Sequence, residues 1–295
     1  MKMDLILPQI GTIGYVQRHR AGRAFCATTA RLAVGCLYSE LVLYPKPGLV
    51  SLIDNGSHGD MNAVTFMRSL FALRHYFGKI CRAGMQGAPF AVLKRLGIEA
   101  EQRMLQATGG INTHRGAIFS LGLLCAAAGR AHAHGGSITA SSLQAHLVAG
   151  WGQQLAAHTG ARGEYSHGLA AAAVHGASGA REEGALGLPS VFGIGVAALR
   201  TALIDGRSMR HARIDALFVL MAHISDTNVV HRAGVDGAAL VRRSARHFIE
   251  RGASAAADWE SVALACHRTF VARNLSPGGA ADLLAASCFV HELTQ

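Results

Sequence analysis

Apolar residues recur along this chain mostly at helical spacing, and short polar segments rich in glycine separate the apolar stretches. Phe66, Leu70, Leu73 and Phe77 follow one another at intervals of three or four residues, which predicts a single buried helical face ending before the glycines at 84–87. Alternation of apolar and polar residues, typical of strands, extends over no useful length. The further helices are expected near residues 24–43, 89–107, 117–128, 141–158, 169–174, 190–204, 210–224, 237–251, 256–272 and 277–293.

This pattern predicts an all-α protein with a single multi-helix globular domain over residues 24–295. Residues 1–23 are interpreted as a loosely attached N-terminal extension. They are not typical of a signal peptide, because their basic residues come late and Asp4 and Pro8 interrupt the apolar part. The longest runs without charged residues or histidine, 116–129 and 184–199, are shorter than the roughly 20 residues that cross a bilayer. The six cysteines show no C-x-x-C spacing and are expected to be core residues in a reducing cytoplasm.

Polar side chains that can bind anions or metal ions gather in the segments between helices. The longest such segment, residues 45–61, contains two prolines and three glycines that forbid a continuous helix. Long irregular segments in helical proteins are usually functional or disordered, and its apolar residues argue against disorder. Similar segments lie at 108–116, 176–189, 226–234 and 274–279. We expect the active site to be formed by these loops and helix ends.

The formal net charge of +10 indicates an anionic partner. The basic residues are mostly arginine, which suits phosphate recognition, but they are scattered rather than gathered on one helix face. Small polyanionic substrates fit this distribution at least as well as nucleic acid does. A nucleic-acid-binding protein remains an alternative that strongly salt-dependent DNA affinity would reveal. A structural scaffold would not explain the clustered polar loops.

These segments contain the motifs Pro45-Lys46-Pro47-Gly48-Leu49-Val50, Gly56-x-His58-x-Asp60-Met61, Thr108-Gly-Gly-Ile-Asn-Thr-His-Arg-Gly116, Gly179-Ala-Arg-Glu182 with Gly187-x-Pro189, Asp226-Thr-Asn228 with His231-Arg232-x-Gly234, and Asn274-Leu-Ser-Pro-Gly-Gly279. Taken together and in this order, the motifs resemble the triphosphoribosyl-dephospho-coenzyme A synthase family, which serves citrate lyase and malonate decarboxylase. The resemblance covers about residue 25 to the C-terminus. Ser51 with Asp54 and Gly56-Ser57-His58 favours the malonate decarboxylase branch.

The resemblance implies a transferase that moves the 5-triphosphoribosyl group of ATP to the 2′-hydroxyl of 3′-dephospho-CoA and releases adenine. The product would be the precursor of an acyl carrier protein's prosthetic group, handed on through a phosphoribosyl-dephospho-CoA transferase. Mg²⁺ is expected to accompany the triphosphate. No membrane partner is expected, and a homodimer is left open. A Mg-dependent helical hydrolase of nucleosides or ADP-ribose, with water as acceptor, is the alternative enzyme.

Glycosyl transfer of this kind calls for carboxylates that deprotonate the nucleophile and stabilise an oxocarbenium-like transition state. The catalytic candidates are Asp54, Asp60, Asp226 and Glu182, with Asp60 and Asp226 also as metal ligands. Asp60 could instead cap the following helix. Glu182 could instead have a purely structural role as the ion-pair partner of Arg181. Glu101 is a weaker candidate for the same face. The predicted substrate-binding residues are Lys46, His58, Asn112, Thr113, His114, Arg115, Arg181, Asn228, His231, Arg232 and Ser276.

Overall fold

A computed structural model describes residues 9–159 and 180–295, with side chains described from residue 20 onward except at 158, 159 and 181. Within these ranges every regular element is a helix and no strand occurs, so the predicted all-α class is confirmed. The helix expected at 169–174 lies outside the described residues. The elements are α1 (Gln9–Leu41), α2 (Ala63–Leu73), α3 (Tyr76–Met85), α4 (Phe90–Thr108), α5 (Arg115–His134), α6 (Ala140–Leu147), η1 (Val148–Gly152), α7 (Gln153–Thr159), α9 (Ala180–Ala185), η2 (Ser190–Gly195), α10 (Val196–Ile204), α11 (Met209–His223), α12 (Thr227–Glu250), η3 (Ala253–Ala255), α13 (Trp259–Ala272) and α14 (Gly278–Leu293).

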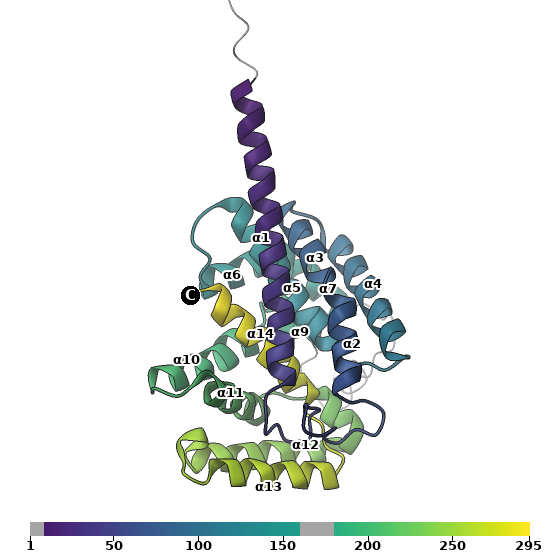
Figure 1. Cartoon of the computed structure of the whole chain (residues 1–295), viewed down its shortest axis with the longest axis vertical. Coiled ribbons are helices and arrows are strands. Elements are labelled where there is room, and N and C mark those ends of the chain that lie inside the picture. Colours follow the sequence, from purple (N-terminus) through teal and green to yellow (C-terminus); the bar gives the residue numbers. More distant parts are fainter. Residues whose placement is uncertain (1–8, 160–179) are drawn as a thin grey trace, which may run out of the picture.

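Helix α5 is the centre of the bundle and packs against α3, α14, α6, α1 and α4 (Figure 1). Its approach to α3 is so close that a Cβ on Gly84 would lie 2.0 Å from the carbonyl oxygen of Ala126, and one on Gly129 equally near that of Cys81. Glycines at these positions therefore allow backbone contact between the two helices. By length and composition α5 could cross a membrane, but most of it is buried inside the bundle, as in the core helix of a globular protein.

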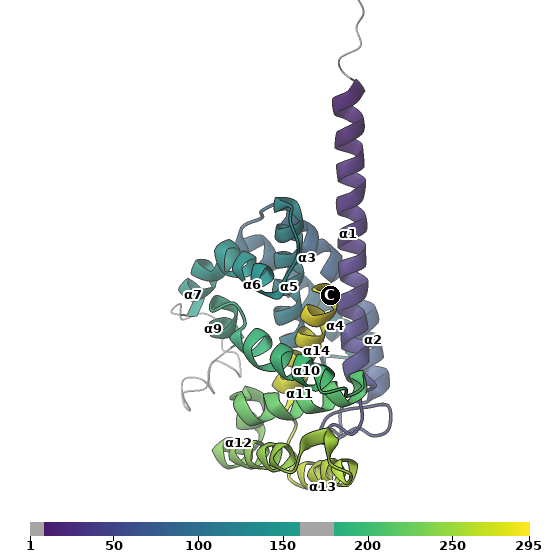
Figure 2. The ribbon, with the colours of Figure 1, turned by 90° about the vertical axis from the view of Figure 1, so that its left-hand side faces the viewer.

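Three helix boundaries differ from the sequence-based prediction. Helix α1 begins at Gln9, and its N-terminal part stands away from the bundle (Figures 1 and 2). The stripe from Phe66 to Phe77 is divided between α2 and α3 by a turn at 74–75, although Leu70, Leu73 and Phe77 are all buried as expected. Helix α12 begins ten residues earlier than predicted and accommodates Gly234 through a kink at φ 65°.

Two predicted helix starts also have different caps. Asn62 caps α2 by accepting a hydrogen bond from the backbone N–H of Thr65, so the alternative in which Asp60 caps this helix is wrong. Helix α14 begins at Gly278 with Pro277 in the cap position and without a side-chain cap. A serine followed by proline is typical of a helix start capped by the serine, and this prediction is wrong for Ser276.

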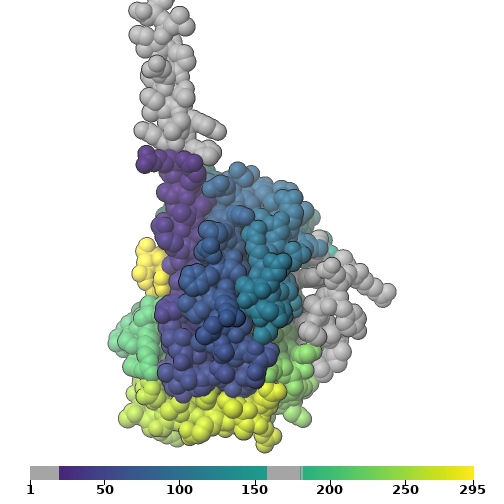
Figure 3. All heavy atoms as spheres, turned by 45° about the vertical axis from the view of Figure 1, so that its right-hand side comes forward, coloured from purple at the N-terminus to yellow at the C-terminus, as the bar shows by residue number. Residues whose placement is uncertain are grey.

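Helices α12 and α13 lie across one end of the bundle, where the long loop between α1 and α2 is also found (Figures 1 and 3). The N-terminus of α14 reaches the same end, because its backbone contacts the start of α12. Loops and helix ends from distant parts of the sequence thus meet there, and the candidate site is built from them.

Candidate active site

The loop between α1 and α2 is fixed in shape by glycines and by a serine. Gly48 has φ +70°, and a Cβ on it would lie 2.0 Å from the carbonyl oxygen of Leu275, so the position accepts no side chain. Gly56 has φ +56°, and a Cβ on it would lie 2.6 Å from the backbone of Gly48. Ser57 Oγ donates to the carbonyl oxygen of Leu275 over 2.6 Å. The loop is therefore attached to the segment between α13 and α14.

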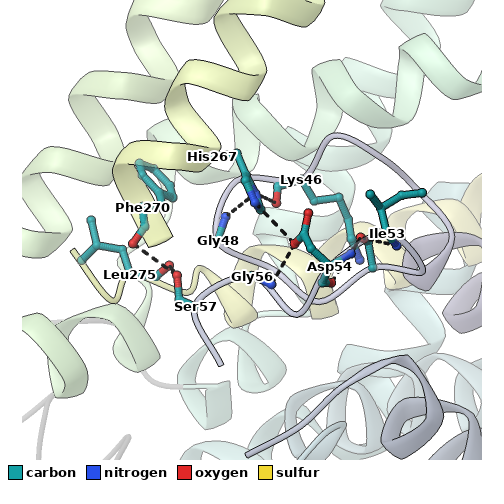
Figure 4. Close-up of polar contacts among 10 residues, drawn as sticks. Lys46, Gly48, Ile53, Asp54, Gly56, Ser57, His267, Phe270 and Leu275 are labelled. Atoms are coloured by element: carbon teal, nitrogen blue, oxygen red, sulfur yellow. Dashed lines mark hydrogen bonds and ion pairs between the residues drawn. The ribbon is translucent and has the colours of Figure 1, made fainter. Parts of the chain in front are cut away.

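Asp54 is presented by a tight turn of this loop (Figure 4). Ser51 Oγ accepts a hydrogen bond from the backbone N–H of Asp54, and the backbone N–H of Gly56 donates to Asp54 Oδ1 over 2.8 Å. His267 Nε2, on α13, lies 3.4 Å from the same oxygen. The side chain of Asp54 is still 34% exposed, so this carboxylate is both held and reachable.

Lys46, predicted as a phosphate ligand, is buried instead of facing solvent. Its Nζ lies 2.6 Å from Glu40 Oε1 and 2.8 Å from the carbonyl oxygen of Glu40, at the end of α1. Burial lowers the pKa of Lys46, and the carboxylates of Glu40 and Asp54 oppose this shift. Lys46 thus attaches the loop to α1 through an internal ion pair.

Arg232 on α12 connects three separate segments. Its Nη2 donates to the carbonyl oxygen of Ser57 over 2.8 Å and to Asn274 Oδ1 over 2.7 Å, and its Nη1 lies 3.2 Å from His58 Nδ1. Three of the predicted motifs therefore meet at one guanidinium group, whose residue remains exposed overall.

His58 lies between Arg232 and the start of α14. Its Nε2 is 2.8 Å from Ser276 Oγ. The Ser276 hydroxyl therefore hydrogen-bonds to His58 and does not cap the helix. Its Nδ1 is 3.6 Å from Asp60 Oδ1, and the side chain of Asp60 is 64% exposed. Burial and the neighbouring Arg232 lower the pKa of His58, while Asp60 opposes the shift. A neutral imidazole is thereby favoured at this position.

Asp226 is buried and joins the N-termini of two helices. Its Oδ1 accepts from the backbone N–H of Asn228 over 2.9 Å, and its Oδ2 from that of Ala280 over 3.1 Å. Backbone N–H groups of Val229 and Gly279 also favour its ionised form, whereas burial, the larger effect, raises its pKa. Since it accepts from backbone N–H groups at two helix N-termini, this carboxylate acts as a shared cap.

The segment before α5 contains a buried histidine, His114, whose ring contacts α2. His114 Nδ1 is 2.6 Å from Ser69 Oγ, and its ring packs edge-on against Phe66. Burial, with the positive charge of Lys46, lowers the pKa of His114 to about 3. His114 Nε2 and Thr113 Oγ1 are buried polar atoms without a hydrogen-bond partner in the described part of the chain.

Around that segment, Asn112 and Arg115 have local partners. Asn112 Oδ1 accepts from the backbone N–H of Arg115 over 3.1 Å, and Arg115 Nε lies 2.5 Å from Glu101 Oε1 on α4. The weaker candidate Glu101 is therefore the ion-pair partner of a predicted phosphate ligand.

The remaining candidates lie at the surface. Asn228 and His231 are exposed near the start of α12, and Glu182 is exposed on α9. The side chain of Arg181 lies outside the described residues. Two hollows of about 690 and 580 Å³, at α4 and between α10 and α11, are lined by none of the predicted site residues.

Three residues of this region were missed by sequence reasoning: Glu40, Ser69 and His267. The sequence does associate Asp282 with the segment 274–279, which it follows by one helical turn. Its Oδ2 occupies the space in which a Cβ of Gly116 would lie, so the carboxyl faces the N-terminus of α5. Burial, Glu40 and Asp226 raise its pKa, against a hydrogen bond from the backbone N–H of Ala117. The other three lie within helices whose pattern gives only packing information.

No group of three or more His, Cys, Asp or Glu side chains that could hold a metal ion occurs among the residues whose side chains are described. Asp226 is a poor ligand because its lone pairs already accept backbone N–H groups. Asp60 is the more accessible of the two predicted metal ligands.

This architecture is an all-helical domain in which loops and helix ends from distant parts of the sequence meet. A family model described as CitG, ATP:dephospho-CoA triphosphoribosyl transferase, matches residues 26–295. The chain belongs to this family, and with it to the enzymes that use ATP and dephospho-CoA as substrates.

Individual relatives agree with the family match. The chain is 37% identical over 259 residues to a probable 2-(5''-triphosphoribosyl)-3'-dephosphocoenzyme-A synthase of Acinetobacter calcoaceticus, covering 88% of each chain. It is 39% identical over 268 residues to the 2-(5''-triphosphoribosyl)-3'-dephosphocoenzyme-A synthase of Pectobacterium atrosepticum, covering 86% of this chain and 85% of the relative. No solved structure matches significantly.

Proposed function

We propose that this enzyme transfers the 5-triphosphoribosyl group of ATP to the 2′-hydroxyl of 3′-dephospho-CoA. The hydroxyl oxygen forms a bond to C1′ of the ATP ribose, the bond from C1′ to N9 of adenine breaks, and its electron pair leaves with adenine. The proton of the hydroxyl passes to a base of the protein, and adenine takes up a proton as it leaves. The observation that carries the proposal is the meeting of Ser57, His58 and Asn274 at Arg232, which joins three family motifs in one site.

Asp54 suits the role of the base better than the other predicted carboxylates do. Asp226 has its oxygens filled by backbone donors, Asp60 is largely exposed, and Glu182 lies on α9. Asp54 combines an orientation fixed by Gly56 with 34% exposure of its side chain. A general base must be oriented toward, and within reach of, the proton that it removes.

The triphosphate would be bound by cationic groups at the rim of the loop. Arg232 and Arg115 are exposed and can present planar donors to phosphate oxygens. Lys46 would contribute its positive charge from inside the protein. Thr113 Oγ1 and His114 Nε2, which have no partner in the described chain, would provide donors if substrate reaches them. Asn112, Arg181, Asn228, His231 and Ser276 remain proposed substrate contacts.

Mg²⁺ is proposed to arrive with the triphosphate, because this cation keeps several waters and usually takes only one or two protein carboxylates. The described side chains do not form a complete site for it, and Asp226 does not fit as a ligand. Asp60 is the carboxylate that a triphosphate-bound ion could reach.

The biological setting is proposed from the resemblance described above. Ser51 and Gly56-Ser57-His58 favour a role in making the prosthetic-group precursor for the acyl carrier protein of malonate decarboxylase, in the cytoplasm. The product is the same molecule in the citrate lyase branch, so the branch is tested in the source cells. Deletion of the gene should leave the malonate decarboxylase carrier protein without its prosthetic group, detected by mass spectrometry.

The reaction itself is tested with purified protein, ATP, Mg²⁺ and 3′-dephospho-CoA. Chromatography should detect adenine, and mass spectrometry should detect an acceptor heavier by one triphosphoribosyl unit. Adenine released equally without dephospho-CoA would indicate the hydrolase alternative. ADP or phosphate as the main product would mean phosphoryl transfer and would contradict the proposal.

A further inference from the structure

We propose that His267 is the positioning residue of the base Asp54, an inference that rests on the proposed function. His267 lies on α13, more than 200 residues after the loop, and belongs to none of the motifs recognised in the sequence. Its side chain is only 10% exposed, so it acts on the reaction through Asp54 rather than by touching substrate.

The geometry requires a proton on the nitrogen that faces Asp54. His267 Nε2 lies 3.4 Å from Asp54 Oδ1, and a lone pair pointing at a carboxylate from this distance would be repelled. The other nitrogen, Nδ1, lies 3.3 Å from the backbone nitrogen of Gly48 and 3.2 Å from the carbonyl oxygen of Lys46. It accepts from the first as neutral imidazole or donates to the second as imidazolium. In both states Nε2 carries a proton and lies 3.4 Å from the carboxylate of Asp54.

The imidazole ring of His267 thus connects two parts of the loop between α1 and α2 (Figure 4). Nδ1 contacts the segment with Lys46 and Gly48, and Nε2 contacts the carboxylate. Asp54 Oδ1 also accepts from the backbone N–H of Gly56. These donors fix the rotation of the carboxylate, and carboxylate orientation decides whether the acceptor hydroxyl meets a lone pair.

Two substitutions distinguish the contact made by Nδ1 from the contact made by Nε2. The amide of asparagine ends where Nδ1 lies, so His267→Asn can keep the contact with Gly48 but loses the donor to Asp54. The amide of glutamine reaches the position of Nε2, so His267→Gln keeps the donor to Asp54. We expect His267→Asn to lower kcat by about a hundredfold, the scale for a misplaced catalytic group, with little change in KM for ATP. His267→Gln should restore most of kcat.

Both variants are compared with wild type and with His247→Asn, a change at an exposed histidine of α12, using adenine release and thermal melting. Wild-type kcat retained in His267→Asn would overturn the inference. Equal loss in both variants, following their melting temperatures, would reduce His267 to a structural residue. Failure of the wild-type enzyme to form the heavier acceptor would instead contradict the proposed function.

If His267→Asn does not fold, nitrogen NMR of the wild-type enzyme tests the inference by showing which nitrogen of the His267 ring carries the proton. The inference predicts that Nε2 carries the proton. An unprotonated Nε2 cannot donate to Asp54 and would overturn it.

Discussion

Arg232 Nη2 donates a hydrogen bond to the carbonyl oxygen of Ser57 over 2.8 Å, although the two residues are 175 positions apart. The same nitrogen also donates to Asn274 Oδ1. The guanidinium therefore holds together the loop after α1, the start of α12 and the segment before α14. A substrate that binds at this point contacts all three.

The first prediction concerns this guanidinium. Arg232→Ala should raise KM for ATP by roughly tenfold to a hundredfold, because charge-assisted hydrogen bonds are worth roughly 1.5–3 kcal/mol. Steady-state kinetics measures the effect, with Arg243→Ala, an exposed arginine on the same helix, as the control. An unchanged KM for ATP in Arg232→Ala would exclude Arg232 from triphosphate binding.

A second prediction tests whether the loop must have this shape. Gly48→Ala should lower both activity and melting temperature, because the added Cβ meets the carbonyl oxygen of Leu275 and the backbone has φ +70°. Gly59→Ala serves as the control, since a Cβ there would meet no atom within 4 Å. Similar behaviour of the two variants would show that the approach of Gly48 to Leu275 is unimportant.

The third prediction is a pH dependence of stability due to His114. Its pKa is about 3 in the folded protein, below the ordinary 6.5, so the folded state binds fewer protons between these values. The free energy of unfolding should therefore decrease as pH falls from about 6.5 toward 3. In His114→Gln this contribution should be absent, which denaturant unfolding at several pH values measures. An NMR titration showing His114 protonated near pH 6 would contradict it.

Much of the fold was predictable because helical periodicity reflects burial directly. The stripe of Leu70, Leu73 and Phe77 is buried as predicted, but the turn at 74–75 between α2 and α3 has no glycine or proline to reveal it. The start of α1 at Gln9 was missed because the apolar residues of this helix do not form a stripe that is distinct from its polar residues.

For the site, the sequence identified the loops but not the contacts between them. Lys46 and Asp226 look like available polar groups in the sequence. In the fold, Glu40 binds Lys46, and the backbone N–H groups of Asn228 and Ala280 bind Asp226. The contacts with Glu40 and Ala280 depend on helix packing. His267 was missed for the same reason, because its partner Asp54 is supplied by a distant loop.

A fourth prediction assigns Asp226 a structural role. Asp226→Asn should lower the free energy of unfolding by roughly 1–3 kcal/mol, because a negative charge at two helix N-termini is lost and an amide N–H₂ faces backbone donors. Turnover at low temperature should remain near that of wild type. Loss of turnover with unchanged melting would return Asp226 to the role of base or metal ligand.

The central claim is that the loop carrying Asp54 supplies the base for triphosphoribosyl transfer. The most direct test is the rate of dephospho-CoA-dependent adenine release by Asp54→Asn, which keeps the shape of the side chain but removes the charge. We predict a fall of about a hundredfold or more, the usual scale for a lost general base, with nearly unchanged melting. Full turnover in Asp54→Asn would contradict the account.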